Sequence, residues 1–181
     1  MIAESAREQV MQKAYDLAYE YEHIYRGCSQ CVLGALQDVF GMPNEDLFRA
    51  MTGFAGGGGA MGDAACGAYS AGIAFLSVLR GRDKHDFADA PGIRYVSFAN
   101  TRKLQRKFID EYGTVICRDI HMKVLGRPFF LPDPDEARKF DEAGAHETGC
   151  PQICGKAARW AAEIALEEGL IPEEKLKELT K

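Results

Sequence analysis

AACGAYSAGIAFLSVL, residues 64–79, is the longest uncharged apolar segment of the chain and lies between Asp63 and Arg80. It is shorter than the roughly 20 residues that a membrane-spanning helix needs, and Cys66, Ser70 and similar small residues dilute its apolar character. The segment therefore predicts a buried core helix of a globular protein. Asp63 has the residue type expected at the N-cap of that helix.

Outside this segment, apolar residues recur mostly at three- and four-residue steps, which is typical of amphipathic helices. We find no useful period-2 alternation, internal repeat or low-complexity linker, and therefore predict an all-α, single-domain helical bundle over residues 1–181 with a glycine-rich loop. We expect Asn44 to cap a short helix, and Phe98, Leu104 and Phe108 to face inward. The predicted helices span about 5–25, 28–40, 45–51, 64–79, 97–112, 115–125, 135–143 and 151–168, with a short charged helix after 172, a charged connection at 81–92 and an extended stretch at 127–134.

Composition limits the classes of function that the chain can serve. Its 181 residues are 46% apolar and 27% charged, and a chain of this length buries about 70% of its unfolded surface without needing disulfides. The net charge of -5 disfavours binding to nucleic acid or a membrane surface, which use basic faces. The start, MIAESAREQV, lacks the apolar run of a secretory signal, so we expect a cytoplasmic protein without a membrane span. The mature form of an exported protein would look the same.

Six cysteines are unusual in a chain that does not need them for stability. In the reducing cytoplasm, cysteines more often indicate metal binding or redox chemistry than structural disulfides. The compact cysteine run of a simple ferredoxin is absent, only one C-x-x-C pair is present, and Val32 replaces the histidine of a haem attachment motif. The pattern therefore favours a site assembled from several helices, and excludes haem here. The cysteines are Cys28, Cys31, Cys66, Cys117, Cys150 and Cys154.

The surroundings of some cysteines favour reactive thiols. Cys28 and Cys150 are expected near helix N-termini, where unpaired N–H groups and the helix dipole lower the pKa of a thiol. His121 follows Cys117 by four residues and His146 precedes Cys150 by four, so each pair shares a face if the segment is helical. Either imidazole could then replace a thiolate as a metal ligand.

Simpler interpretations of these residues stay open. A free cysteine often packs as a small apolar residue, and this applies best to Cys31 and Cys154, which can be core-facing helix residues. The two histidines can equally lie at the surface or support the site through hydrogen bonds. No catalytic residue is predicted, and whether the protein is an enzyme stays open.

The glycine-rich loop matches the dinucleotide fingerprint at Gly57-x-Gly59-x-x-Gly62. That fingerprint is meaningful only after a strand, and residues 47–51 look helical, so nucleotide binding is not expected. The loop instead indicates a close backbone approach to a group that tolerates no side chain. We expect the N–H groups of Gly56, Gly57, Gly58 and Gly59 to face a cofactor, since hydrogen bonds to sulfur tune the potential of iron–sulfur centres.

Several of these features together resemble a known family. They are Cys28 with Gln30 near it, the Gly-Phe-x-Gly-Gly-Gly stretch from Gly53, the Cys-Gly-Ala sequence from Cys66, and isolated Cys117 and Cys150. This order is similar to that of the C_GCAxxG_C_C family of redox-active proteins, interpreted here as a CGAxxG motif, over about residues 28–168. The last glycine of that motif falls on Ala71, with Gly72 next to it.

The resemblance implies a cysteine-based redox function. The family is similar to the cysteine-cluster module of split-Soret cytochromes c, which is helical and dimeric and has been linked to an iron–sulfur centre. Its four signature cysteines correspond to Cys28, Cys66, Cys117 and Cys150. Cys31 and Cys154 lie outside the signature.

Three hypotheses follow. In the first, the four signature cysteines bind a [2Fe–2S] or [4Fe–4S] cluster for electron transfer, with Cys31 or Cys154 as alternate or additional ligands. This function requires a redox partner protein, and a homodimer is possible. In the second, Cys28/Cys31 or Cys150/Cys154 form an exchanging thiol–disulfide pair. In the third, zinc staples an interaction module without redox activity.

Overall fold

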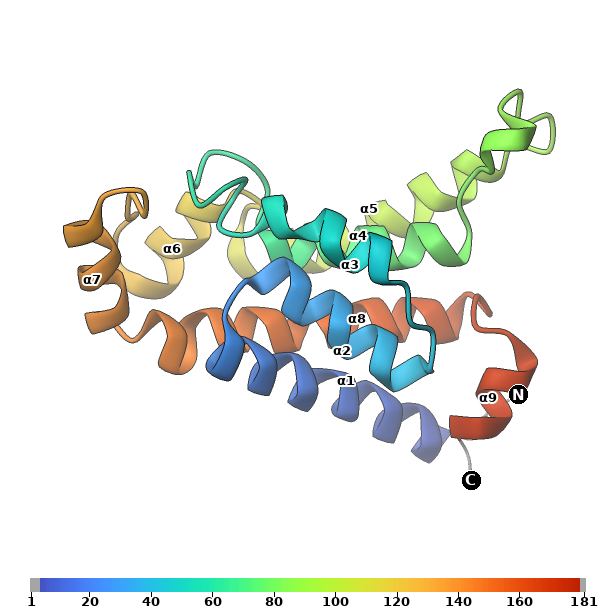
Figure 1. Cartoon of the computed structure of the whole chain (residues 1–181). Helices are drawn as coiled ribbons and strands as arrows, with labels where there is room; N and C mark the ends of the chain where they lie inside the picture. Colours follow the sequence, from blue (N-terminus) through green and yellow to red (C-terminus); the bar gives the residue numbers. More distant parts are fainter. Residues whose placement is uncertain (1–3, 180–181) are drawn as a thin grey trace.

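The computed structural model describes residues 4–179, and the regular structure in this part of the chain is helical (Figure 1). Short 3-10 turns cover Met51–Phe54 and Lys84–Asp86, and a π-helical turn, Ala145–Gly149, leads directly into the last long helix. No β-strand occurs within residues 4–179, which confirms the all-α bundle. The helices are α1 (Glu4–Tyr25), α2 (Cys28–Phe40), α3 (Glu45–Ala50), α4 (Gly67–Leu79), α5 (Ile93–Tyr112), α6 (Cys117–Leu125), α7 (Pro134–Glu142), α8 (Cys150–Glu167) and α9 (Glu173–Leu179).

Helices α1 and α8 lie side by side along the length of the bundle (Figure 1). Both helices carry fully buried alanines, and small side chains let helices approach closely. Helices α2 and α4 pack against each other and against α8, which completes the main core. The fully buried alanines are Ala14 and Ala18 of α1 and Ala157, Ala158, Ala161, Ala162 and Ala165 of α8.

Helix α5 packs on α4 and α8, and aromatic rings fill the space between them. The ring centroids of Phe108 and Trp160 lie 5.4 Å apart in an edge-to-face arrangement, which is favourable for aromatic pairs. A Cβ atom at Gly72 would lie 2.7 Å from Cδ2 of Leu104. Glycine at position 72 is therefore required by the close approach of α4 and α5.

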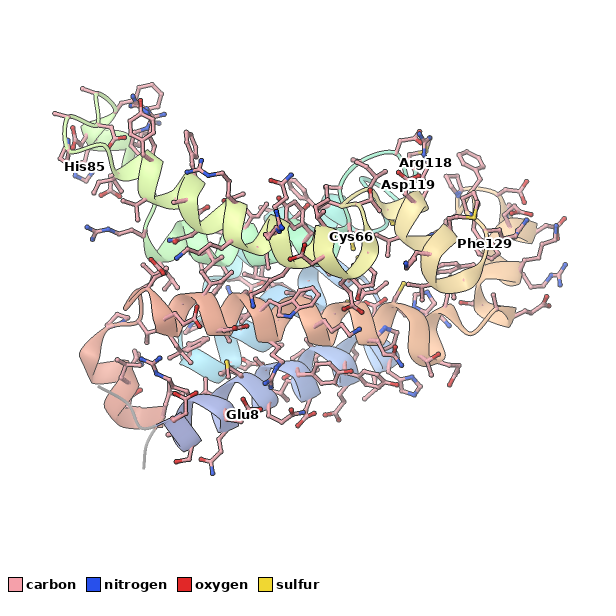
Figure 2. The ribbon with its side chains drawn as sticks, turned by 180° about the vertical axis from the view of Figure 1, so that it is seen from behind. Glu8, Cys66, His85, Arg118, Asp119 and Phe129 are labelled. Carbon is pink, nitrogen blue, oxygen red and sulfur yellow. The ribbon has the colours of Figure 1, made fainter. Side chains whose placement is uncertain are left out.

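Helix α5 begins at Ile93, four residues earlier than predicted. The carboxylate of Asp89 accepts the N–H groups of Ile93 at 2.7 Å and Arg94 at 3.0 Å, which stabilises the extra turn. The extra turn belongs to a hairpin that projects from the bundle, with His85 at its tip (Figures 1 and 2). Phe98 is 51% exposed, so its inward placement was wrong, whereas Leu104 and Phe108 are buried as predicted.

Helix α4 begins at Gly67 rather than Ala64, and the predicted N-cap at Asp63 is wrong. Residues 64–66 instead run antiparallel to residues 115–117, with a bridge between Ala65 and Ile116. The N–H of Cys66 donates to the carbonyl of Val115 at 2.8 Å, and the N–H of Cys117 donates to that of Ala64 at 3.0 Å. These non-local hydrogen bonds hold the chain extended up to Cys66.

Other local predictions are confirmed. The side chain of Asn44 accepts the N–H of Leu47 at 3.0 Å and so caps α3. Pro151 occupies the first turn of α8, where a missing N–H costs nothing. Between residues 4 and 179, no helix is both long and apolar enough to cross a membrane.

Candidate functional site

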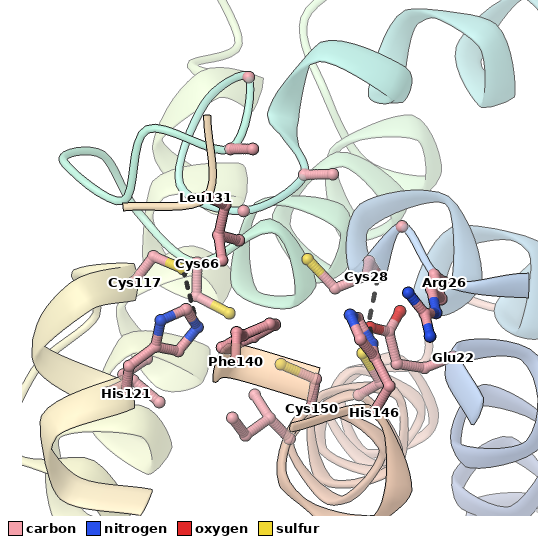
Figure 3. Close-up of a pocket in the computed structure, with 18 of the residues that line it drawn as sticks. Glu22, Arg26, Cys28, Cys66, Cys117, His121, Leu131, Phe140, His146 and Cys150 are labelled. Atoms are coloured by element: carbon pink, nitrogen blue, oxygen red, sulfur yellow. Dashed lines mark hydrogen bonds and ion pairs between the residues drawn. The ribbon is translucent and has the colours of Figure 1, made fainter. Parts of the chain in front are cut away.

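Four helices begin at one place in the molecule, and each begins at a cysteine. Cys28, Cys117 and Cys150 are the first residues of α2, α6 and α8, and Cys66 is the N-cap residue of α4. No side chain caps any of these four helix starts. The four sulfur atoms surround a common space (Figure 3). The partial positive charges of the N-termini of α2, α4 and α6 therefore lie near these thiols, whereas α8 continues the π-helical turn Ala145–Gly149.

These thiols line a cavity of about 340 Å³. Cys154, one turn into α8, adds a fifth thiol to the wall and lies 3.9 Å from the carbonyl oxygen of Cys28. Cys31 does not line the cavity. Its thiol donates to the carbonyl of Arg26 at 3.1 Å and lies beside the carboxylate of Glu22. The structure thus brings together the four signature cysteines and Cys154, and leaves Cys31 outside.

One glycine of the glycine-rich loop and the first residue of α4 give two of these cysteines their space. A Cβ atom at Gly57 would lie 2.6 Å from Cβ of Cys117, and one at Gly67 would lie 2.6 Å from Sγ of Cys28. Real Cβ atoms do not approach so closely. The four glycines at positions 56–59 have positive φ, with values of 60°, 73°, 83° and 56°, a left-handed path that glycine follows without strain, and Ala60 continues it with a φ of 64°. The sequence of glycines is therefore needed both for the path and for the contacts.

The N–H groups of the loop have different partners. That of Gly56 is directed at the Cys28 thiol and lowers its pKa. Those of Gly58 and Gly59 donate to the carbonyls of Phe54, at 3.4 Å, and Gly53, at 2.8 Å. Of the four glycines predicted to face a cofactor, Gly56 and Gly59 line the cavity. A 3-10 turn precedes the loop instead of a strand, as expected for a chain without a dinucleotide fold.

Cys66, Cys117 and Cys154 are buried, whereas Cys28 and Cys150 are partly buried. The Cys66 thiol and burial raise the pKa of Cys28 well above its usual value. Burial, followed by the charge of Glu22, does the same for Cys150 and Cys154. Burial also raises the pKa of Cys117 to about 12. The predicted lowering of the pKa at Cys28 and Cys150 is therefore wrong, because the Cys66 thiol at Cys28 and desolvation at Cys150 raise it instead.

Both predicted histidines line the cavity. Nε2 of His121 lies 3.5 Å from Sγ of Cys117, as their four-residue spacing predicts. Burial lowers the pKa of His121 to about 4, so its imidazole is neutral, and its Nδ1 has no hydrogen-bond partner. His146 lies in the π-helical turn before α8, and its Nδ1 is 3.2 Å from Oε1 of Glu22. The histidines therefore face the thiols from two different helical segments (Figure 3).

Glu22 is a cavity residue that the sequence interpretation missed. It lies in the last turn of α1, is 1% exposed, and lines the cavity with the thiols. A signal for it was present, since Val10, Ala14 and Ala18 form the buried row of α1 and Glu22 continues that row by the same four-residue step. A carboxylate at such a position indicates a buried charge with a local purpose.

The donor atoms surround a space that is larger than one ion. Within residues 4–179, no three side chains of His, Cys, Asp or Glu are placed to hold a single metal ion. The five thiols are instead spread over the wall of a cavity of about 340 Å³. The residues present thus fit a group of several atoms with thiolate ligands better than a mononuclear site.

A comparison with known protein families identifies the family of this chain. The family model "Putative redox-active protein (C_GCAxxG_C_C)" matches residues 27–164, which include the four helix-start cysteines. The chain belongs to this family. No curated protein and no solved structure gives a significant match.

The family name also corrects one detail of the motif. Its G-C-A-x-x-G block, placed on Cys66, puts glycine, alanine and glycine at positions 65, 67 and 70, where this chain has Ala65, Gly67 and Ser70. The CGAxxG interpretation, with its last glycine at Ala71, was therefore out of register with the name. Gly67 has its own structural reason in this chain, because it packs against Cys28.

Proposed function

We propose that this protein is a cysteine-ligated iron–sulfur protein that transfers electrons. Cys28, Cys66, Cys117 and Cys150 would hold a [2Fe–2S] or [4Fe–4S] cluster, which supplies a one-electron redox couple when bound. The observation that carries the proposal is that four helices each begin at a cysteine, without a capping side chain, on the wall of one cavity. Electron transfer also implies a redox partner protein.

The electrostatics of the site suit an anionic group. An iron–sulfur cluster with four thiolates carries negative charge, and helix N-termini stabilise anions through their partial positive charge and free N–H groups. The N–H of Gly56, directed at the Cys28 sulfur, would remain useful when that sulfur is a ligand, because hydrogen bonds to sulfur tune the potential. The raised pKa values of Cys28, Cys117 and Cys150 support binding of a metal group, because a nearby cation would favour the ionised form of these thiols.

The size of the cavity favours a cluster over a zinc staple. A structural zinc ion needs four ligands within about 2.3 Å of one point, and the described side chains hold no such set. Cys154 is the additional thiol that could serve a larger group, because it shares the cavity wall. Cys31 is the natural control residue, because it lies on the same helix as Cys28 but outside the cavity.

Anaerobic reconstitution of the full chain with iron and sulfide tests the proposal. We expect a visible charge-transfer absorption that dithionite bleaches. Cys28→Ser should lose most of this absorption, whereas Cys31→Ser should keep it, since a serine hydroxyl can also donate to the Arg26 carbonyl. The absence of absorption in the wild-type protein, with six free thiols, would contradict the proposal. Equal loss in both variants would contradict the ligand assignment.

One contact favours a second candidate, a thiol–disulfide redox function. The thiols of Cys28 and Cys66 are in hydrogen-bonding contact, so they form a better candidate pair than Cys28/Cys31 or Cys150/Cys154, which the spacing suggested. Their burial disfavours it, because an attacking thiol needs exposure and a low pKa. A reversible Cys28–Cys66 disulfide, identified by peptide mapping of metal-free protein, together with rapid alkylation at neutral pH, would favour this function.

A further inference from the structure

Glu22 places a carboxylate among the cavity thiols. Its side chain is 1% exposed and lines the cavity, where it faces Cys28 and Cys150 (Figure 3). A buried carboxylate is costly unless it is paired and hydrogen-bonded. The contacts of its two oxygen atoms therefore show whether the protein itself compensates for the burial of this carboxylate.

The protein satisfies only part of this carboxylate. Oε1 of Glu22 lies 3.2 Å from Nδ1 of His146, within ion-pair distance, but neither that Nδ1 nor Oε2 of Glu22 has a hydrogen-bond partner among the described residues. The nearby Cys31 thiol donates to the carbonyl of Arg26. The guanidinium of Arg26 is largely exposed and pairs with Asp141 at 3.3 Å.

Oε2 of Glu22 is not the only polar atom of this cavity wall without a hydrogen-bond partner among the described residues. Nδ1 of His121 is a further buried polar atom without a partner, and it belongs to the same cavity wall. The negative charge of Glu22 also raises the pKa of Cys28, Cys150 and Cys154, so the carboxylate is close to the thiols that would bind a metal group. A carboxylate beside several thiols favours a metal-containing group, because its positively charged metal ions would offset the negative charge of the carboxylate and of the thiolates.

We propose that Glu22 is an oxygen ligand to one metal ion of the group that this cavity holds, an inference that rests on the proposed function. Carboxylate is a harder donor than thiolate, so the iron that it binds differs from the thiolate-bound irons and exchanges its ligand more readily. His146 is a positioning residue, because its Nδ1 lies beside the oxygen that does not bind the metal. Such supporting contacts orient the ligands of metal sites.

Glu22→Gln tests this role, because it removes the anionic oxygen and keeps the shape of the side chain. Glu20→Gln is the matched control, since Glu20 is exposed on the same helix and the charge change is identical. After anaerobic reconstitution, Glu22→Gln should lose iron to a chelator at least about 10-fold faster than wild type and show an altered electron paramagnetic resonance spectrum. Glu20→Gln should match wild type in both.

A structural role for Glu22 predicts a different result. In the metal-free protein, Glu22→Gln should unfold at the same denaturant concentration as wild type or a higher one, because a buried unpaired charge is removed. A purely structural glutamate predicts a lower midpoint. Glu22→Cys supplies a thiolate at the same position, so it should restore iron retention and shift the electron paramagnetic resonance spectrum. If Glu22→Gln does not fold, Glu22→Cys still tests whether residue 22 binds the metal.

The outcomes separate this inference from the function on which it rests. If wild-type protein takes up no iron–sulfur group, both fail. If wild type takes up the group and Glu22→Gln keeps the same iron-loss rate and spectrum, only the role of Glu22 fails. A faster loss that Glu22→Cys does not reverse would also overturn it.

Discussion

The helices of this protein begin in two ways. Helices α3, α5 and α7 begin beside Asn44, Asp89 and Asp133, whose side chains accept N–H groups of the first turn. Helices α2, α4, α6 and α8 begin at cysteines, and no side chain caps them. The capped helices satisfy their first turns within the chain. The cysteines at the starts of the other four helices line a shared cavity.

This difference indicates that the four helix starts with cysteines lack a stabilising cap because their residues serve the candidate site. A good capping residue stabilises a helix by about 1 kcal/mol. Helices α2, α4, α6 and α8, which start with cysteines, have no capping side chain. Their starts are held instead by tertiary contacts, such as the bridge between Ala65 and Ile116 and the glycine contacts with Cys28 and Cys117. Departures from local stability rules are expected at functional sites.

The largest effect should come from the contact that holds α6. Gly57→Ala should lower the free energy of unfolding of metal-free protein by about 3 kcal/mol or more, because the new Cβ meets Cys117 at 2.6 Å in addition to the cost of its left-handed φ. Gly59→Ala has a similar φ but no neighbour within 4 Å, so it should cost only about 1 kcal/mol. Urea denaturation measures both, and equal losses would contradict the packing role of Gly57.

Hydrogen exchange should separate the two kinds of helix start. Loading with iron and sulfide should slow exchange of the first-turn amides of α2 and α4 at least about tenfold, equivalent to about 1.4 kcal/mol. Exchange at the starts of α3 and α7 should not change, because their caps are already formed. Mass spectrometry of metal-free and loaded protein gives the comparison, and uniform protection of all helix starts would refute it.

Loss of the cap of α7 should lower the stability of the protein by the same amount whether or not metal is bound. Asp133 accepts the N–H groups of Asp135 at 2.8 Å and Glu136 at 3.1 Å. Asp133→Ala should therefore cost about 1 kcal/mol of stability in both the metal-free and the loaded protein. Denaturation curves of the two forms check this. A much larger loss in the loaded form would mean that α7 contributes to metal binding.

The smallest effect on stability should accompany the loss of a ligand. Cys66→Ser puts a favourable capping residue at the N-cap position of α4, so metal-free protein should keep its stability or gain up to about 1 kcal/mol. The same variant should not retain iron. Destabilisation of the metal-free form by more than about 1 kcal/mol would show that Cys66 matters mainly as a core residue.

Local sequence signals predicted the helices well and the pairing of distant segments poorly. The Asn44 cap and Pro151 in the first turn of α8 are local, and both were found. The start of α4 was misplaced because the backbone hydrogen bonds between residues 64–66 and 115–117 join segments about 50 residues apart. The pattern of apolar residues within 63–79 contains no information about pairing with residues 115–117.

For the candidate site too, local sequence predicted some features, and the tertiary structure determined the others. Cysteine type and order identified the residues, and helix spacing placed His121 beside Cys117. The direction of the thiol pKa shifts was wrong, because burial depends on all the surrounding helices. Glu22 was missed because a glutamate in an amphipathic helix is normally exposed, and only its place in the buried row of α1 distinguishes it.

Iron and acid-labile sulfide content of the anaerobically purified full chain is the most direct test of the four-cysteine site. Wild type and Cys31→Ser should contain iron and sulfide in equal amounts, while Cys28→Ser, Cys66→Ser, Cys117→Ser and Cys150→Ser should each lose both. Wild-type protein that contains only zinc, or six free thiols and no metal after reconstitution, would contradict the account.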